Sequence, residues 1–500
     1  MDSLVSHLVS WIVLTPFIGM VIIGFLRHAE VIRWATLATT LLVLGLTLGL
    51  WAGFDHTATG MQFVDRVALG IFSFQYAVGV DGISLPLILL TAFLIPLCVL
   101  GSWTGIKENV KAFMLLILLV EGAVAGVFTA LDTFLFFLFW EITMIPMYFM
   151  IALWGGPNRI QAAVKFLLFS VAGSLLLNLG IEALHHEGGN TYDVVALTQV
   201  EFSPEVQFWI FLALFVGFAI KVPMLLVHGW IADAHGEAPT AGSVILSGLL
   251  LKMGTYGFLR FCLPIFPETS VAFAPFIQWL SVLAILYGGA MALAQHDFKR
   301  LIAYSSIAHM GFVTLGIFGF NNQSVQGAVL QMVNHGITTG ALFLVVGMLY
   351  DRTHDRTIDN YGGLHQVMPR FVVILSIFVV AAFGLPGTGN FIGEFLVLAG
   401  TLSHSYLMVL LVLAGIVLGA AYMLGMFQRM ALGPVSPQNA TLPDLTRREV
   451  ATVIPLILAV FAVGLYPTFM LDVTHMSVAV LVKDLAQVQP LQIIETLTAP

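Results

Sequence analysis

Long apolar stretches, separated by short polar connections, dominate this sequence. A stretch of about 18 or more apolar residues is long enough to cross a lipid bilayer as a helix. These stretches lack the alternation of apolar and polar residues that marks a barrel strand, and each is about twice as long as such a strand. The pattern predicts an all-α polytopic membrane protein with fourteen spans, at about residues 4–26, 34–52, 83–103, 112–130, 132–154, 162–184, 207–229, 242–263, 274–294, 301–320, 325–350, 371–400, 405–428 and 451–470.

The connections predict little further structure. Residues 53–80 form a long connection, and partial alternation around Phe72–Tyr76 is typical of a short hairpin. Residues 351–370 form a polar connection. Residues 471–488 have apolar positions at helical spacing, which predicts a helix lying along the membrane interface. The chain is therefore predicted to be a single membrane domain over residues 1–500.

Composition supports a membrane protein and excludes other classes. Hydrophobic residues make up 59% of the chain and charged residues 9%, against roughly 25% charged residues in a soluble domain. The two cysteines, Cys98 and Cys262, lie in separate apolar stretches, which excludes a disulfide framework or a metal cluster. A net charge of −8 without a basic patch argues against nucleic-acid binding. No phosphate-binding loop of the GxGxxG or Walker type is present.

The basic residues predict how the chain is oriented in the membrane. Connections after odd-numbered spans hold fourteen of the nineteen lysines and arginines, and the opposite side holds only Arg66, Arg260 and Lys483. The positive-inside rule then places the odd-numbered connections in the cytoplasm or matrix and both termini on the outer face. The last two lysines, Lys221 and Lys252, fall inside apolar spans.

Several ionisable residues lie where they are costly. An ionisable side chain at the bilayer centre costs roughly 2.5–3.5 kcal/mol on insertion scales, so each needs a structural or functional reason. The residues concerned are Glu121, Glu141, Lys221, Lys252, His309, His335 and Glu394.

Two explanations compete for these residues. A glutamate and a lysine can form a structural ion pair that only holds two helices together, and a lone histidine is more often a hydrogen-bonded packing residue. For Glu121, which has no helix breaker or second polar group beside it, the structural explanation is preferred. Four or more charges over spans five, seven, eight and twelve instead favour a proton relay, because the pKa values of buried acids and bases depend on their neighbours.

Helix breakers lie beside two of these charges. Pro223 follows Lys221 closely and cannot donate a hydrogen bond to the carbonyl of Ala219, so the seventh span is predicted to open there and leave that carbonyl free for water. The twelfth span is predicted to break one turn before Glu394. The breaking residues are Gly384, Pro386, Gly387 and Gly389.

Interrupted helices in matching positions are typical of transporters built from inverted repeats. Glu141 and Lys221 are 80 residues apart, and His309 and Glu394 are 85 residues apart. We predict two inverted five-helix repeats, spans 4–8 and 9–13. The predicted divisions are 1–111 (N-terminal helices), 112–263 (first repeat), 274–428 (second repeat) and 429–500 (C-terminal helix and interfacial tail).

Several motifs resemble a known family. Residues 227–243, VHGWIADAHGEAPTAGS, are similar to the loop between helices seven and eight in antiporter-like membrane subunits of proton-pumping NADH:quinone oxidoreductase (respiratory complex I) and its relatives. The resemblance covers essentially the whole chain. Further matches are Val80–Leu85, Phe139–Glu141, Asp297–Ser306 and Asn334–Gly336.

The resemblance implies roles for matched positions. Glu141 and Lys221 would be the coupled pair of the first half-channel, and Lys252 the central relay residue. His309 and His335 would extend the path. Glu394 would be the terminal carboxylate, and a glutamate rather than a lysine there favours the M-type subunit, as does the absence of a long C-terminal lateral helix.

The motif loop also has simpler explanations. Residues 238–243 would serve to restart a helix, with proline near its first turn and small residues packing closely. Asp233, His235 and Glu237 would either gather protons at the cytoplasmic mouth or simply be solvated.

The resemblance also implies the protein's surroundings. It implies no cofactor on this chain, with FMN, iron–sulfur clusters and quinone on partner subunits. Partners would be other antiporter-like and small membrane subunits in a bacterial cytoplasmic membrane, which is preferred over the mitochondrial inner membrane. Two alternatives remain, a subunit of a multisubunit cation/proton antiporter and a subunit of a membrane-bound hydrogenase.

Overall fold

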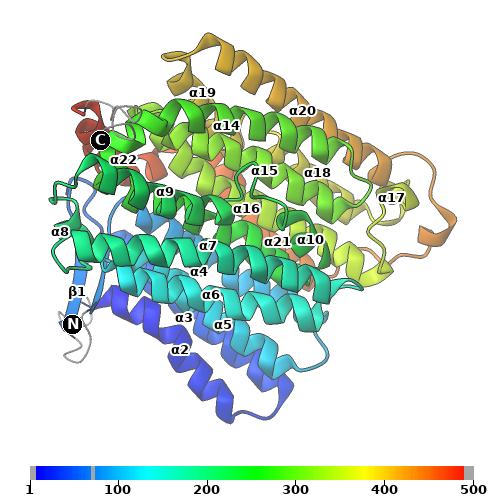
Figure 1. Ribbon diagram of the computed structural model, residues 1–500. Coiled ribbons are helices and arrows are strands. Elements are labelled where there is room, and N and C mark those ends of the chain that lie inside the picture. The colour runs from blue at the N-terminus through cyan, green and yellow to red at the C-terminus, as the bar shows by residue number, and fades with distance from the viewer. Residues whose placement is uncertain (1–6, 69–73, 489–500) are drawn as a thin grey trace.

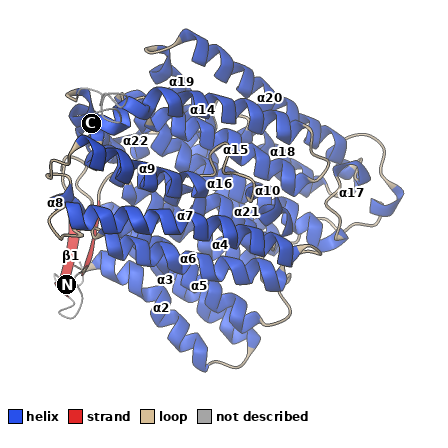
Figure 2. Cartoon of the chain, in the orientation of Figure 1, coloured by secondary structure: helices blue, strands red, loops and turns tan. Residues whose placement is uncertain are grey.

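The computed structural model describes residues 7–68 and 74–488, and this part of the chain is almost entirely helical (Figure 2). Long helices lie side by side in one bundle (Figure 1). Its helices are α2 (Leu8–Phe25), α3 (Ala29–Gly53), α4 (Ser84–Gly101), α5 (Val110–Thr129), α6 (Thr133–Trp154), α7 (Arg159–Glu187), α8 (Val194–Leu197), α9 (Pro204–Lys221), α10 (Ile231–Glu237), α11 (Thr240–Ile245), η1 (Leu246–Leu250), α12 (Leu251–Gly257), η2 (Phe258–Cys262), α13 (Leu263–Ile265), α14 (Pro267–Leu293), α15 (Phe298–Ile317), α16 (Asn322–Thr353), η3 (Ile358–Asn360), α17 (Leu364–Val367), α18 (Pro369–Ala382), α19 (Gly389–Leu402), α20 (Tyr406–Ala431), η4 (Pro437–Asn439), α21 (Arg447–Leu465) and α22 (Thr468–Ala486).

The helices confirm the predicted all-α membrane fold. Within the described ranges, twelve helices are long and apolar enough to cross a membrane. Eleven are single helices, and the twelfth is the run from α11 to α13, Thr240–Ile265. The other two predicted spans correspond to α15, which is more polar, and to the short helices α18 and α19. The first predicted span begins at residue 4, and residues 4–6 lie outside the described part.

The seventh span is interrupted, but its predicted course was wrong in two respects. The prediction continued the helix to residue 229, whereas α9 ends at Lys221 and turns lead to α10. The carbonyl of Ala219, predicted to be free, accepts the backbone N–H of Met224 at 2.8 Å. The N–H of Met224 therefore takes the place of the N–H that Pro223 lacks, and no water is needed at that carbonyl.

The twelfth span breaks where the glycines and proline predicted. α18 ends at Ala382 and α19 begins at Gly389. Gly384 has φ +75° and Gly387 has φ +96°, a conformation that costs a residue with a Cβ atom strain energy. Two glycines thus turn the chain between the half-helices.

A two-stranded hairpin marks one end of the bundle. β1 (Gln62–Ala68) and β2 (Gln75–Val80) are antiparallel. Gln62 pairs with Val80 and Asp65 pairs with Val78, and the register shifts between these two pairs. The hairpin predicted in residues 53–80 is therefore present, although Phe72, within the predicted alternation, lies outside the described residues. We call this the hairpin end, and the opposite end, which holds α10 and α17, the basic end (Figure 1).

Two segments form the interior of the bundle. The run Thr240–Ile265 and the long helix α16 are fully buried along their most apolar stretches, whereas α3, α20 and α21 bury about a third of theirs. The buried run contains two π-helical segments, η1 and η2, on either side of α12. Insertions of this kind are frequent at functional sites.

The end of the chain differs from the predicted boundary. The last span was placed at 451–470, but α21 ends at Leu465 and α22 begins at Thr468. α22 packs against α16, and the Ser477 hydroxyl accepts the backbone N–H of Gly82 at 2.9 Å. Its position at the membrane interface stays a prediction, as does the division of the chain into two inverted repeats.

Candidate functional site

Lys252 and His335 meet at the centre of the bundle. Lys252 lies on α12, between the two π segments, and His335 lies on α16. Both side chains are fully buried. Nζ of Lys252 lies 2.7 Å from Nδ1 of His335 and donates to the carbonyl of Ser247, in the preceding π segment. Two residues that the sequence placed in separate spans are therefore in direct contact.

His309 continues this row towards the broken twelfth span. Its ring on α15 lies 5.5 Å from the ring of His335, centroid to centroid. Its Nδ1 lies 3.0 Å from Oε1 of Glu394 on α19. Gln331, one turn before His335, donates to the same carboxylate oxygen at 3.1 Å. Four predicted residues thus form one buried row, Lys252, His335, His309 and Glu394.

With Lys252 charged and Glu394 ionised, the contacts assign one tautomer to each histidine. A charged lysine only donates, so Nδ1 of His335 accepts and its hydrogen lies on Nε2. An ionised glutamate only accepts, so Nδ1 of His309 carries its hydrogen. With Lys252 charged and Glu394 ionised, the donors along the row point from the lysine towards the carboxylate. Such a row can pass a proton in that direction. The histidines must then return to these tautomers before the next proton can pass.

Lys221 and Glu141 form a second group. Lys221 is the last residue of α9, is 2% exposed, and its ammonium has no hydrogen-bond partner among the described residues. It lies over the rings of Trp140 and Phe166, 5.3 and 5.7 Å from their centroids. Glu141, next to Trp140 on α6, interacts with this lysine through its charge. Aromatic faces stabilise a cation without fixing it in a hydrogen bond.

The two groups are joined by helix packing. Gly254 on α12 lies against the end of α9, where an added Cβ would come within 2.7 Å of the Phe218 carbonyl and 2.8 Å of Val222. The segment that carries Lys252 thus packs directly on the segment that carries Lys221. No hydrogen bond or ion pair between described residues links the two lysines, so a proton passing between them needs water or a movement of the side chains.

The break in the twelfth span shapes the surroundings of Glu394. A Cβ at Gly384 would come within 3.1 Å of the Glu394 carboxylate. Asn334, beside His335, donates to the carbonyl of Gly389 at 2.7 Å. The break therefore lets backbone groups approach the relay closely.

Glu121 does not form the structural ion pair that the sequence favoured. It is fully buried on α5, and neither carboxylate oxygen has a hydrogen-bond partner among the described residues. It therefore has no hydrogen bond to the row of four.

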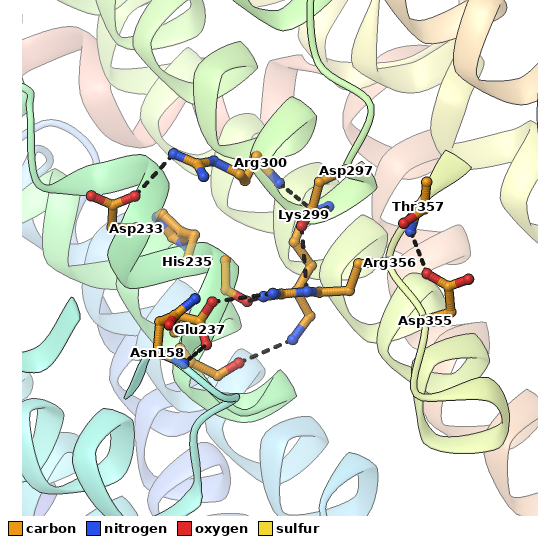
Figure 3. A network of polar contacts seen from close by, with 12 residues as sticks. Asn158, Asp233, His235, Glu237, Asp297, Lys299, Arg300, Asp355, Arg356 and Thr357 are labelled. Carbon is orange, nitrogen blue, oxygen red and sulfur yellow. Dashed lines mark hydrogen bonds and ion pairs between the residues drawn. The ribbon is translucent and has the colours of Figure 1, made fainter. Parts of the chain in front are cut away.

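The two acids of the motif loop, Asp233 and Glu237, are paired rather than simply solvated. Asp233 forms ion pairs with Lys165 at 2.7 Å and with Arg300 at 2.9 Å. Glu237 pairs with Arg356 at 3.1 Å and accepts the backbone N–H of Asn158 at 3.0 Å (Figure 3). These contacts hold α10 against the start of α15 at the basic end.

Arg356 connects two acids in this network. Burial alone would lower the pKa of its guanidinium, but the carboxylates of Asp297 and Glu237 raise that pKa above its ordinary value. Burial raises the pKa of Asp297, although Arg356 opposes this. Arg356 therefore stays charged and fixes the connection between α16 and η3 against α10 and the start of α15.

A polar cavity of about 240 Å³ opens beside this network. Glu237, Lys299, Tyr350 and Asp351 are among its lining residues. His235 lies nearby, fully buried, with its ring stacked on Phe343 and neither nitrogen hydrogen-bonded within the described residues. The Ala238–Ser243 segment restarts a helix as predicted, with Pro239 at its N-cap.

Sequence reasoning missed three features of the site. Gln331 lies four residues before His335, and this helical spacing was the available signal for its contact with Glu394. The aromatic surroundings of Lys221 include Trp140, the neighbour of Glu141, but Phe166 comes from another helix and gave no signal. Nothing in the sequence indicated the π segments.

Comparisons with known proteins agree with this fold. Residues 130–419 match the family model described as NADH:quinone oxidoreductase/Mrp antiporter, TM, and residues 11–124 match NADH-ubiquinone oxidoreductase chain 4, amino terminus. NADH-quinone oxidoreductase subunit M of Rhodobacter capsulatus is 44% identical over 90% of each chain. NADH-ubiquinone oxidoreductase chain 4 of Arabidopsis thaliana is 43% identical over 95% of this chain and 97% of its own.

A solved structure shows the same architecture. A chain of respiratory complex I from Thermus thermophilus with bound NADH superposes with a TM-score of 0.88 at 30% identity, covering 95% of this chain and 99% of its own. The fold and its buried acids and bases define an antiporter-like membrane subunit. Within that class, the chain belongs to the family of subunit M, or chain 4, of NADH:quinone oxidoreductase.

Proposed function

We propose that this chain moves protons through the membrane arm of an NADH:quinone oxidoreductase, along Glu141, Lys221, Lys252, His335, His309 and Glu394. The observation that carries this proposal is the buried row from Lys252 to Glu394. Four helices contribute one titratable group each, and each group lies against the next.

The properties of these groups suit a relay better than a set of structural pairs. A structural pair is strongest when both partners are fixed by hydrogen bonds. Lys221 and Nε2 of His335 are buried without such partners among the described residues. A group in that position can exchange its proton when a neighbouring charge changes.

The polar cavity at the basic end is the proposed site of proton uptake. It contains the ionisable side chains of Glu237, Lys299 and Asp351. His235 lies behind it and interacts through charge with both Lys299 and Lys252. Its place in the chain beside Gly236 and Glu237, which line the cavity, makes it the candidate link between the cavity and the row.

The orientation and surroundings complete the proposal. The basic end would face the cytoplasm of a bacterium, with both termini on the outer face of its cytoplasmic membrane, because the connections at this end hold most of the arginines and lysines. Flavin, iron–sulfur clusters and quinone would lie on partner subunits, and redox chemistry would take place there. This chain would supply only proton movement.

Two measurements test the proposal. Purification in mild detergent should recover the chain with flavin-containing, NADH-oxidising subunits and further membrane subunits. When reconstituted vesicles are given NADH and a quinone, their interior should become more acidic or more alkaline, depending on the orientation of the complex in the vesicle membrane. Recovery with small membrane subunits alone, together with sodium-dependent proton exchange, would contradict the proposal and support a cation/proton antiporter.

A further inference from the structure

A second row of polar groups leaves Lys252 in the opposite direction, towards the hairpin end. Lys252 and Tyr256 lie four residues apart on α12, and Arg260, in the π segment η2, donates to the Tyr256 hydroxyl, so the three residues follow one another along the buried run. The row covers ~12 Å of helix. This second row is not part of the relay to Glu394. It would give a proton on Lys252 a short route to the hairpin end of the bundle.

Tyr256 is locked in place within this second row. Its hydroxyl donates to the carbonyl of Phe128 at 3.1 Å and accepts from Nε of Arg260 at 3.1 Å. A hydroxyl passes a proton only if it can accept one proton and release another. Here its hydrogen points at a carbonyl that does not titrate, and the group that donates to its oxygen is a guanidinium that keeps its protons.

Arg260 and Asp81 close the row. The side chains are buried, and an Arg260 terminal nitrogen lies 2.7 Å from Oδ1 of Asp81. The same oxygen accepts the backbone N–H groups of Ile83 and Ser84 at 3.1 and 2.9 Å. Burial by itself would raise the pKa of Asp81, but Arg260 and these N–H groups outweigh it and lower that pKa below its ordinary value. The pair therefore stays ionised at neutral pH.

We propose that Arg260, held in place by Asp81, is a barrier that prevents protons on Lys252 from escaping directly to the hairpin end. A proton leaving Lys252 in this direction meets the guanidinium before the carboxylate, and a fixed positive charge repels protons. Protons must then leave Lys252 through His335. This role rests on the proposed relay through Lys252.

A purely structural pair would have different consequences. Asp81 directly follows β2 and precedes α4, so its contact with Arg260 also ties the hairpin connection to the buried run. If tying these segments together were the only role of the pair, removing both charges should leave the proton permeability of the membrane unchanged. The barrier predicts a leak even when no charge is left unpaired.

The test is the passive proton permeability of vesicles that contain the whole complex, without NADH, after an imposed pH difference. Arg260→Gln and the double variant Asp81→Asn/Arg260→Gln should increase the leak several-fold. Arg260→Lys, which keeps the charge, should remain tight. Arg159→Gln, at an exposed arginine on α7, is the matched control.

A third substitution identifies the path. Adding Lys252→Met to the double variant should return the leak to the wild-type level, because the escaping protons come through that lysine. A tight double variant, or a leak that persists without Lys252, would overturn the barrier. If the double variant does not assemble, the single variants decide, and equal leaks through Arg260→Gln and Arg260→Lys would overturn the barrier. The relay is judged separately: normal pumping by Glu141→Gln and His335→Phe would refute the relay itself, whereas lost pumping with a tight double variant would refute only the barrier.

Discussion

The ammonium of Lys252 lies 2.7 Å from Nδ1 of His335, which joins two buried helices at positions 83 residues apart. This contact makes the centre of the molecule a place where a proton can pass between helices. Burying either side chain without the other would cost free energy, because each would then be an ionisable group in the interior without a side-chain hydrogen-bond partner. The predictions below follow from this contact and from the groups on either side of it.

Glu141 is expected to act through its titratable proton. Glu141→Gln keeps the size of the side chain and its capacity to hydrogen-bond but removes that proton, so proton pumping and coupled quinone reduction should fall together, by roughly 10²-fold. Glu141→Asp should keep part of the activity. Pumping is measured in vesicles, with Glu187→Gln on the exposed end of α7 as the control. Normal pumping by Glu141→Gln would remove this residue from the relay.

Lys221 and Glu141 are expected to be coupled in function rather than in assembly alone. Either single substitution leaves one charge without its partner, whereas Glu141→Gln with Lys221→Met removes both. The double variant should regain assembly but not pumping. Native gels measure the first and vesicle acidification the second. Regained pumping would show that the pair is only structural.

The packing between α9 and α12 is expected to be intolerant of a single methyl group. Gly254→Ala would place a Cβ within 2.7 Å of the Phe218 carbonyl and push Lys252 away from the end of α9. Overpacking of this kind costs about 1–3 kcal/mol, so the assembled complex should inactivate at a lower temperature and pump more slowly. Gly45→Ala on α3, where a Cβ meets nothing within 4 Å, is the matched control. Equal heat resistance of the two variants would contradict this prediction.

Much of the fold could be predicted because membrane helices have a simple requirement. A lipid-spanning segment must be long, apolar and internally hydrogen-bonded, and those properties are visible along a single sequence. The breaks beside Lys221 and Glu394 were equally visible, since proline and glycine act on the local backbone.

Contacts between helices were much less predictable. Lipid and protein interior are both apolar, so the sequence does not distinguish α16, which is wholly buried, from α20, of which about a third is buried. The charges revealed that Lys252, His335, His309 and Glu394 face inward, but their order in space depends on packing. The same limit applies to the Ala219 carbonyl, whose new donor, Met224, follows from the path of the turn and not from Pro223 itself.

The central claim is that protons cross the middle of this chain through His335. The most direct test is the rate of proton translocation in vesicles that contain the complex with His335→Phe, which keeps a ring and removes both nitrogens. His186→Phe, at an exposed histidine on α7, controls for the loss of an imidazole. We expect the His335 variant to assemble and to lose pumping by roughly 10²-fold, while the control pumps normally. Pumping by His335→Phe at the rate of the control would contradict the claim.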